Sequence, residues 1–177
     1  LKDDPLFDGF ICGSSYVRYG GEIVENHFLS REIVESVVNW GRKTGNYVFF
    51  EGVSESFVMN GFQGSEDLCD EMLMRENLPE ITKVTFWCKP GEVPDGYFKG
   101  LRLVRFPYYA EGILEGWDKS SGMKIILERE GLTARDAWAF GDSENDRDML
   151  RFAGNSVCMP GAPADFDGFC VYRTSAK

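Results

Sequence analysis

The C-terminal part of the chain alternates helices and strands, and this alternation constrains the fold more than any other feature. The pattern predicts a helix over residues 118–131, an apolar strand at Ala137–Phe140, a second helix over 143–154 and a strand at Val157–Met159. Short loops between such elements are typical of a parallel α/β sheet, because parallel strands are joined by crossover helices. We therefore expect a parallel sheet in this part of the chain.

The stretch from about residue 16 to residue 106 has a different pattern, rich in strands with local hairpins. The predicted strands are Tyr16–Tyr19, Glu22–Glu25, Tyr47–Phe50, Phe57–Met59, Ile81–Cys88 and Leu101–Phe106. Ser30 and Ser65 are the expected N-caps of two helices between them. Hairpins indicate antiparallel pairing, so this stretch is predicted to be an α+β module with an antiparallel sheet.

The charge balance excludes some classes of partner. The 177 residues include 29 acidic and 19 basic ones, for a net charge of -10. A nucleic-acid or anionic-membrane binder would rely on basic patches, so neither partner is expected. A phosphorylated ligand stays possible if a metal cation supplies local positive charge. His27 is the only histidine, which argues against phosphohistidine chemistry and multi-histidine zinc sites.

Five cysteines, an odd number, are scattered without the spacing of a zinc site; they are Cys12, Cys69, Cys88, Cys158 and Cys170. This pattern predicts reduced, buried thiols rather than a disulfide framework. No signal peptide opens the chain, and no apolar run reaches the length of a transmembrane helix. Together these features favour a cytoplasmic protein.

The segment Gly141–Asp146 is the most informative stretch for chemistry. Asp142 falls at the carboxyl end of the predicted strand, and Asn145 and Asp146 fall in the first turn of the next helix. Open α/β sheets bind their ligands at this edge, and hard oxygen ligands suit Mg²⁺. A helix N-terminus also favours an anion. The alternative is a capping box of Ser143 with Asp146, which leaves Asp142 and Asn145 unexplained.

Lys119 is the second candidate, at the start of the preceding helix. A cation there can neutralise a phosphoryl oxygen or hold a neighbouring carboxylate. The alternative is a solvated surface lysine, the usual fate of this residue type.

These segments together resemble the last two motifs of the haloacid dehalogenase superfamily, and most closely its Cof-type sugar-phosphate phosphatase branch. The matching residues are Lys119 with Gly122-Met123-Lys124, the run Phe140–Asp146, and Met149-Leu150. Upstream, Asp8–Cys12 resembles the core strand before the cap in that branch. Residues 16–106 are similar to its C2-type cap.

The resemblance implies a Rossmann-like parallel sheet core with an inserted α+β cap domain. Residues 1–15 would supply the core strand before the cap, 16–106 the cap, and 107–177 the C-terminal half of the core. Such enzymes form an aspartyl-phosphate that water then hydrolyses.

The resemblance also implies a role for each candidate residue. Asp142 would be a Mg²⁺ ligand and Lys119 the cation that contacts phosphate. Asn145 would contact substrate or phosphate, and Asp146 would support Lys119 or a metal-bound water.

Three departures from the family pattern stand out. The nucleophile motif Asp-x-Asp-Gly-Thr and the following Ser/Thr motif do not occur in the sequence. Asp8-Gly9 matches the Asp-Gly of the first motif, but the residue two positions before Asp8, where the nucleophile would stand, is Leu6. We therefore expect both motifs to lie upstream, and the chain alone to be inactive. Ser120 replaces the usual glycine after the motif lysine, and Ser14-Ser15 replaces the usual Asn-Gly after the strand.

The expected function is that of a Mg²⁺-dependent phosphatase for a small phosphorylated metabolite. Two alternatives stay open: a phosphomannomutase-like phosphomutase, and a catalytically silent binding or regulatory protein. The substrate and the oligomeric state do not follow from the sequence, because loops set specificity.

Overall fold

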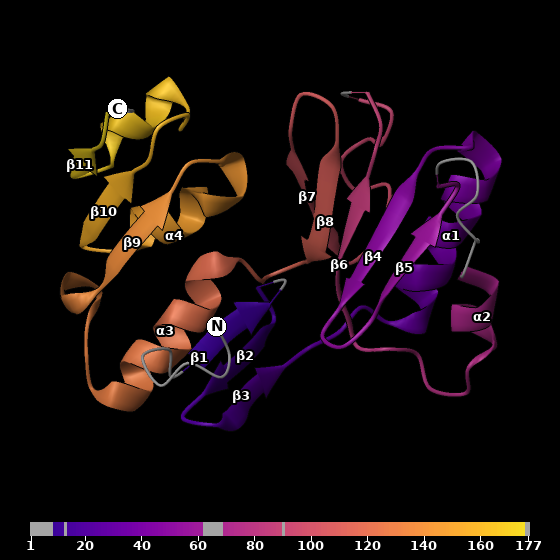
Figure 1. The fold of residues 1–177 in the computed structure, drawn as a ribbon, viewed down its shortest axis with the longest axis horizontal. Helices are drawn as coiled ribbons and strands as arrows, with labels where there is room; N and C mark the ends of the chain where they lie inside the picture. Colours follow the sequence, from indigo (N-terminus) through magenta and orange to yellow (C-terminus); the bar gives the residue numbers. More distant parts are fainter. Residues whose placement is uncertain (1–8, 13, 62–68, 90, 176–177) are drawn as a thin grey trace. The chain divides into compact units, whose positions relative to one another are not determined.

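The structure is a computed structural model that describes residues 9–12, 14–61, 69–89 and 91–175 (Figure 1). The chain divides into two compact units. Unit 1 joins residues 1–25 to 117–177, and unit 2 comprises residues 26–116.

Unit 2 is built on a five-stranded antiparallel sheet in the order β5-β4-β6-β8-β7 (Figure 1). Its strands are β4 (Val48–Gly52), β5 (Ser56–Met59), β6 (Ile81–Phe86), β7 (Leu101–Arg105) and β8 (Ala110–Leu114). Helices α1 (Arg31–Thr44) and α2 (Cys69–Met74) pack their buried side chains into one hydrophobic core with this sheet. The antiparallel module expected from the hairpins is confirmed.

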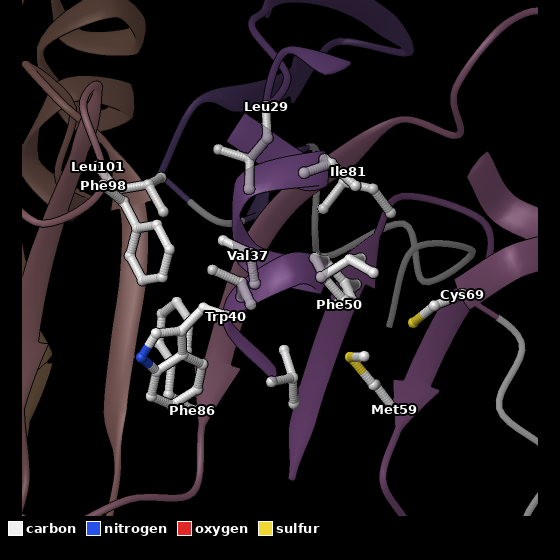
Figure 2. Close-up of a cluster of buried hydrophobic side chains, with 14 of the residues drawn as sticks. Leu29, Val37, Trp40, Phe50, Met59, Cys69, Ile81, Phe86, Phe98 and Leu101 are labelled. Atoms are coloured by element: carbon white, nitrogen blue, oxygen red, sulfur yellow. The ribbon is translucent and has the colours of Figure 1, made fainter. Parts of the chain in front are cut away.

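Helix α1 begins at its predicted N-cap and ends at a glycine. The Ser30 side chain accepts a hydrogen bond from the Ile33 N–H, and Gly45 closes the helix at a φ of 70°. Glycine reaches this left-handed conformation without the steric cost that a Cβ brings. The buried face of the helix packs into the core of unit 2, where the Trp40 ring meets the rings of Phe86 and Phe98 edge-on (Figure 2).

Unit 1 contains two three-stranded sheets. One is antiparallel, with β1 (Gly9–Cys12), β2 (Tyr16–Tyr19) and β3 (Glu22–Asn26). The other is parallel, in the order β11-β10-β9, with β9 (Trp138–Gly141), β10 (Asn155–Cys158) and β11 (Tyr172–Arg173). Helices α3 (Lys119–Glu130) and α4 (Arg147–Phe152) complete the unit. The expected parallel sheet is confirmed.

The parallel sheet buries one face and exposes side chains on the other. Ala139 and Cys158 face a small core that includes Leu150 of α4. Trp138 and Phe140 are 57% exposed, and their rings stack on each other. The apolar run at Ala137–Phe140 therefore forms a strand as predicted, but alternate side chains of this strand point away from the core.

Two boundaries differ from the sequence pattern. The range 107–177, expected to form part of the core, includes Ala110–Leu114, but these residues form β8, which pairs with both β6 and β7 in the sheet of unit 2. Strand β2 lies in unit 1, where it pairs with β1. Whether unit 2 acts as a cap stays a prediction. The expected N-cap Ser65 lies outside the described residues.

The prediction of five reduced thiols is wrong for one pair. Cys158 and Cys170 form a disulfide with a Cα–Cα distance of 6.1 Å. Cys158 is the last residue of β10, and the chain folds back so that Cys170, twelve residues later, lies beside it. The spacing of the cysteines in the sequence does not reveal this approach. Cys69 and Cys88 are free and buried. The cytoplasmic location stays a prediction. Reduced thiols were one argument for it, and the disulfide removes that argument for Cys158 and Cys170.

Among the described residues, no helix is long and apolar enough to cross a membrane.

Candidate active site

The candidate site is built on the loop that follows β9. Asp142 comes directly after the strand, and Ser143 leads into a 3-10 turn at Glu144–Asp146 that continues into α4. Gly141 allows the loop to close on itself, because a Cβ there would lie 2.5 Å from the Asp146 Cβ. A side chain at position 141 would therefore displace Asp146.

Asp146 is buried and holds the loop together. Its Oδ2 accepts hydrogen bonds from the N–H groups of Asp142 and Ser143, at 3.1 and 3.2 Å. Its Oδ1 accepts a hydrogen bond from Lys119 Nζ at 2.5 Å. Burial alone raises the pKa of the Asp146 carboxyl, but the hydrogen bond and charge of Lys119, together with the N–H groups of Asp142 and Ser143, leave that pKa below its ordinary value. Asp146 is therefore ionised at neutral pH.

Lys119 reaches this loop from the first turn of α3. Asp118 caps that helix, accepting a hydrogen bond from the Ser120 N–H, and so fixes where α3 begins. The Lys119 Nζ donates to Asn145 Oδ1 at 3.2 Å as well as to Asp146. The structure thus brings together three of the four residues that the sequence selected, across 26 and 27 residues of chain.

The capping alternative accounts for part of this arrangement. Ser143 and Asp146 do form a capping box around the 3-10 turn. A box of this kind satisfies backbone groups and needs no lysine. The contacts of Lys119 with both Asn145 and Asp146 therefore require a second explanation.

Asp142, the fourth candidate, presents a carboxylate to solvent beside this cluster. Within the described part of the chain, no hydrogen bond or ion pair engages that carboxylate. An unengaged hard oxygen donor fits Mg²⁺, which binds through one or two carboxylates and keeps several waters. Among the described residues, no group of three or more His, Cys, Asp or Glu side chains is arranged so that it could hold a metal ion by itself. Asp142 would therefore be one ligand of a site completed by other groups.

The two departures among the described residues are accommodated. Ser120 is 2% exposed, and its hydroxyl donates to the Asp118 carboxylate that caps α3. Ser14 has a φ of 75°, the left-handed region that glycine and asparagine enter most readily. Leu6, the residue at the expected nucleophile position, lies outside the described residues.

Sequence reasoning missed a charged network on the outer side of the loop. Arg147 makes ion pairs with Glu144 and with Asp165. The spacing of Glu144 and Arg147 is a signal for the first pair, since residues three apart on a helix are neighbours. Nothing in the sequence spacing indicates the contact with Asp165.

A family model for haloacid dehalogenase-like hydrolases matches residues 102–172. This match covers the candidate site, both helices of unit 1 and the strand β9.

Two of the curated bacterial relatives are named as phosphatases. The chain is 25% identical over 165 residues to an HMP-PP phosphatase of Escherichia fergusonii, covering 80% of this chain and 58% of the relative. It is 34% identical over 97 residues to a 5-amino-6-(5-phospho-D-ribitylamino)uracil phosphatase of Bacillus subtilis, covering 49% of this chain and 36% of the relative. The chain thus spans less than two thirds of the length of these relatives.

The fold is similar to that of solved haloacid dehalogenase structures. A sugar phosphatase of subclass IIB superposes with a TM-score of 0.77 at 22% identity, covering 96% of this chain and 70% of that one. A phosphatase of the superfamily from Bacteroides thetaiotaomicron superposes with a TM-score of 0.74 at 18% identity, covering 95% and 68%. At these identities the likeness concerns the fold alone.

Proposed function

We propose that this chain, a haloacid dehalogenase-like protein by its sequence match and its fold, is part of a Mg²⁺-dependent phosphatase for a small phosphorylated metabolite. The phosphatase activity of the curated relatives supports the reaction class. The metal, the mechanism and the roles of individual residues are our inference from the site.

The contact of Lys119 with Asp146 and Asn145 is the observation that carries the proposal. A lysine ammonium has three N–H donors, and these two residues occupy two of them. The third donor is available for a phosphoryl oxygen. Asp146 keeps the ammonium at the carboxyl edge of β9, where open α/β sheets bind their ligands. Asn145 would fix the other side of the same phosphate or the substrate next to it.

Asp142 would hold the metal. When bound, Mg²⁺ would supply charge stabilisation to the phosphoryl oxygens. The backbone of Asp142 is fixed by its N–H bond to Asp146, so the carboxylate extends from a stationary point. Because Asp146 also binds Lys119, it would couple the position of Asp142 to that of Lys119.

The attacking aspartate of the proposed reaction is not among these residues. We propose that it lies in a segment that the longer relatives have and these 177 residues do not include. It would attack phosphorus, and water would then hydrolyse the aspartyl-phosphate. The chain alone would bind phosphate weakly and turn over no substrate.

A phosphatase assay on two proteins tests the proposal. One is the 177-residue chain, and the other is the protein translated from the extended reading frame of the gene. Magnesium-dependent, saturable hydrolysis of p-nitrophenyl phosphate is expected from the extended protein only. Lys119→Met should lower its kcat/KM by roughly a hundredfold, as loss of a charged transition-state contact does.

Lys124→Met provides the matched control, since Lys124 lies on the same helix and its Nζ lies 5.1 Å from the centre of the Phe152 ring. It should leave the rate within about twofold, as expected of a side chain outside the site. The absence of turnover by the extended protein would contradict a phosphatase. A requirement for added sugar bisphosphate would instead identify a phosphomutase.

A further inference from the structure

The outer side of the candidate-site loop is tied down by Arg147, the first residue of α4. Its guanidinium donates two hydrogen bonds to the Glu144 carboxylate, from Nε to Oε1 at 2.5 Å and from Nη2 to Oε2 at 2.8 Å. Glu144 begins the 3-10 turn that contains Asn145 and Asp146. A two-point bond between planar groups fixes orientation as well as distance. Arg147 therefore restrains the turn at Glu144, and Lys119 restrains it at Asn145 and Asp146.

The remaining nitrogen of the same guanidinium, Nη1, and the face of the group lie against a platform, which we define as the exposed Asp165, the buried Phe166 and the half-buried Phe169. Nη1 donates to Asp165 Oδ2 at 2.8 Å, and the guanidinium lies 4.6 Å from the centre of the Phe166 ring. Phe166 is fully buried and belongs to the core of unit 1. Arg147 is thus anchored to the core, with a side chain only 20% exposed.

The platform is itself fixed to the parallel sheet. The Cys170 N–H donates to the Phe166 carbonyl at 2.9 Å, and the disulfide joins Cys170 to Cys158 at the end of β10. The Met159 N–H donates to the Gly141 carbonyl at 2.8 Å, which returns to the start of the site loop. These contacts connect the platform to Gly141, where the site loop begins. Arg147 connects the same platform to Glu144 within the site loop.

We propose that Arg147 is a positioning residue for the candidate site: by holding Glu144 against the platform, it keeps Asn145 and Asp146 in register with Lys119. This inference rests on the proposed function for its catalytic consequence. Among the described residues, no hydrogen bond joins the Arg147 side chain to Lys119, Asn145 or Asp146, so it acts through Glu144. Lysine cannot replace it, because one ammonium cannot reproduce the guanidinium fork.

Hydrogen exchange of single amides tests the positioning role without any activity. The informative amides are those of Asp142 and Ser143, which donate to Asp146. In Arg147→Met and Arg147→Lys, their exchange should accelerate about tenfold or more, since a charge-assisted bond that restrains the loop is lost. The control is Arg151→Met. Arg151 lies on the same helix with its guanidinium 4.9 Å from the Phe169 ring.

In the control, these two amides should exchange as in the wild type. Glu144→Gln should reproduce the effect of Arg147→Met, and the double variant should add little to either one. Equal acceleration at all amides of unit 1 would instead show a general loss of stability and overturn the proposal. Unchanged exchange at Asp142 and Ser143 would overturn it as well.

Kinetics of the extended protein separate this inference from the proposed function. If both hold, Arg147→Met and Arg147→Lys should lower kcat about tenfold with little change in KM for p-nitrophenyl phosphate, because geometry rather than affinity is disturbed. If no variant and no wild type turns over substrate, the proposed function fails, and the exchange experiment still decides the role of Arg147. Wild-type kcat in Arg147→Lys would overturn the positioning role in catalysis.

Discussion

The Nζ of Lys119 and the Oδ1 of Asp146 lie 2.5 Å apart, although 27 residues separate them in the sequence. The lysine side chain is 40% exposed and the aspartate side chain only 9% exposed. One partner is thus open to a ligand while the other is enclosed by the loop. The exposure of the ammonium leaves room for the contact with phosphate that we propose for Lys119.

The pair should make stability depend on pH in the acid range. The pKa of Asp146 is lowered in the folded protein, so its contribution is present above the ordinary value of 3.8 and is lost as pH falls through the lower, folded value. Urea unfolding of the 177-residue chain at pH 7, 4 and 3 should therefore show a smaller decline for Asp146→Asn than for the wild type. Lys119→Met should flatten the curve in the same direction. Parallel curves for Asp146→Asn and the wild type would contradict this account.

Gly141 should tolerate no side chain. In Gly141→Ala the new Cβ would meet the Asp146 Cβ at 2.5 Å, so either the strand end or Asp146 must move. We expect a loss of roughly 1–3 kcal/mol in the free energy of unfolding, as overpacked sites show. Gly168→Ala is the control, since a Cβ there meets nothing within 4 Å. Urea denaturation of both variants measures the difference, and equal stability of the two would contradict the close approach.

The network on the sheet of unit 2 offers a prediction outside the candidate site. Lys83 Nζ lies 3.0 Å from carboxylate oxygens of both Glu51 and Glu111. Lys83→Met would leave two partly buried carboxylates without a cation, which should cost on the order of 2 kcal/mol of stability because breaking a buried pair is costly. The exposed Lys99, changed to Met, should cost almost nothing. An equal effect of the two changes in urea denaturation would show that the network contributes no stability.

Local features of this fold follow from the sequence, and long-range ones do not. Ser30 caps its helix where predicted, and Asp118 caps the helix predicted to start at residue 118, because capping depends on residues within one turn. The sheet to which β8 belongs depends on pairing with β6, which the pattern of five residues cannot report. The exposure of Trp138 is likewise a tertiary property, since an apolar run does not tell which face is covered.

The candidate site divides along the same line. The motif residues Lys119, Asn145 and Asp146 could be selected from their types and positions, and the structure brings them together. Arg147 could not, because its bond to Asp165 links residues 18 apart, with the rest of α4 and the strand β10 between them. The roles of the motif residues stay predictions until the proposed assays are done.

The disulfide should contribute measurably to the stability of unit 1. Cys158 and Cys170 close a loop with a sequence separation of 12, for which the chain-entropy model gives about 3 kcal/mol. Cys170→Ser should therefore unfold at lower urea concentration than the oxidised wild type. A phosphine reductant should bring the wild type to the level of Cys170→Ser and leave that variant unchanged, because Cys69 and Cys88 are free in both. Alkylation under denaturing conditions followed by mass spectrometry should count two fewer free thiols in the oxidised protein than in the reduced one. Equal counts, with an unfolding curve insensitive to the reductant, would show that the bond does not form in solution.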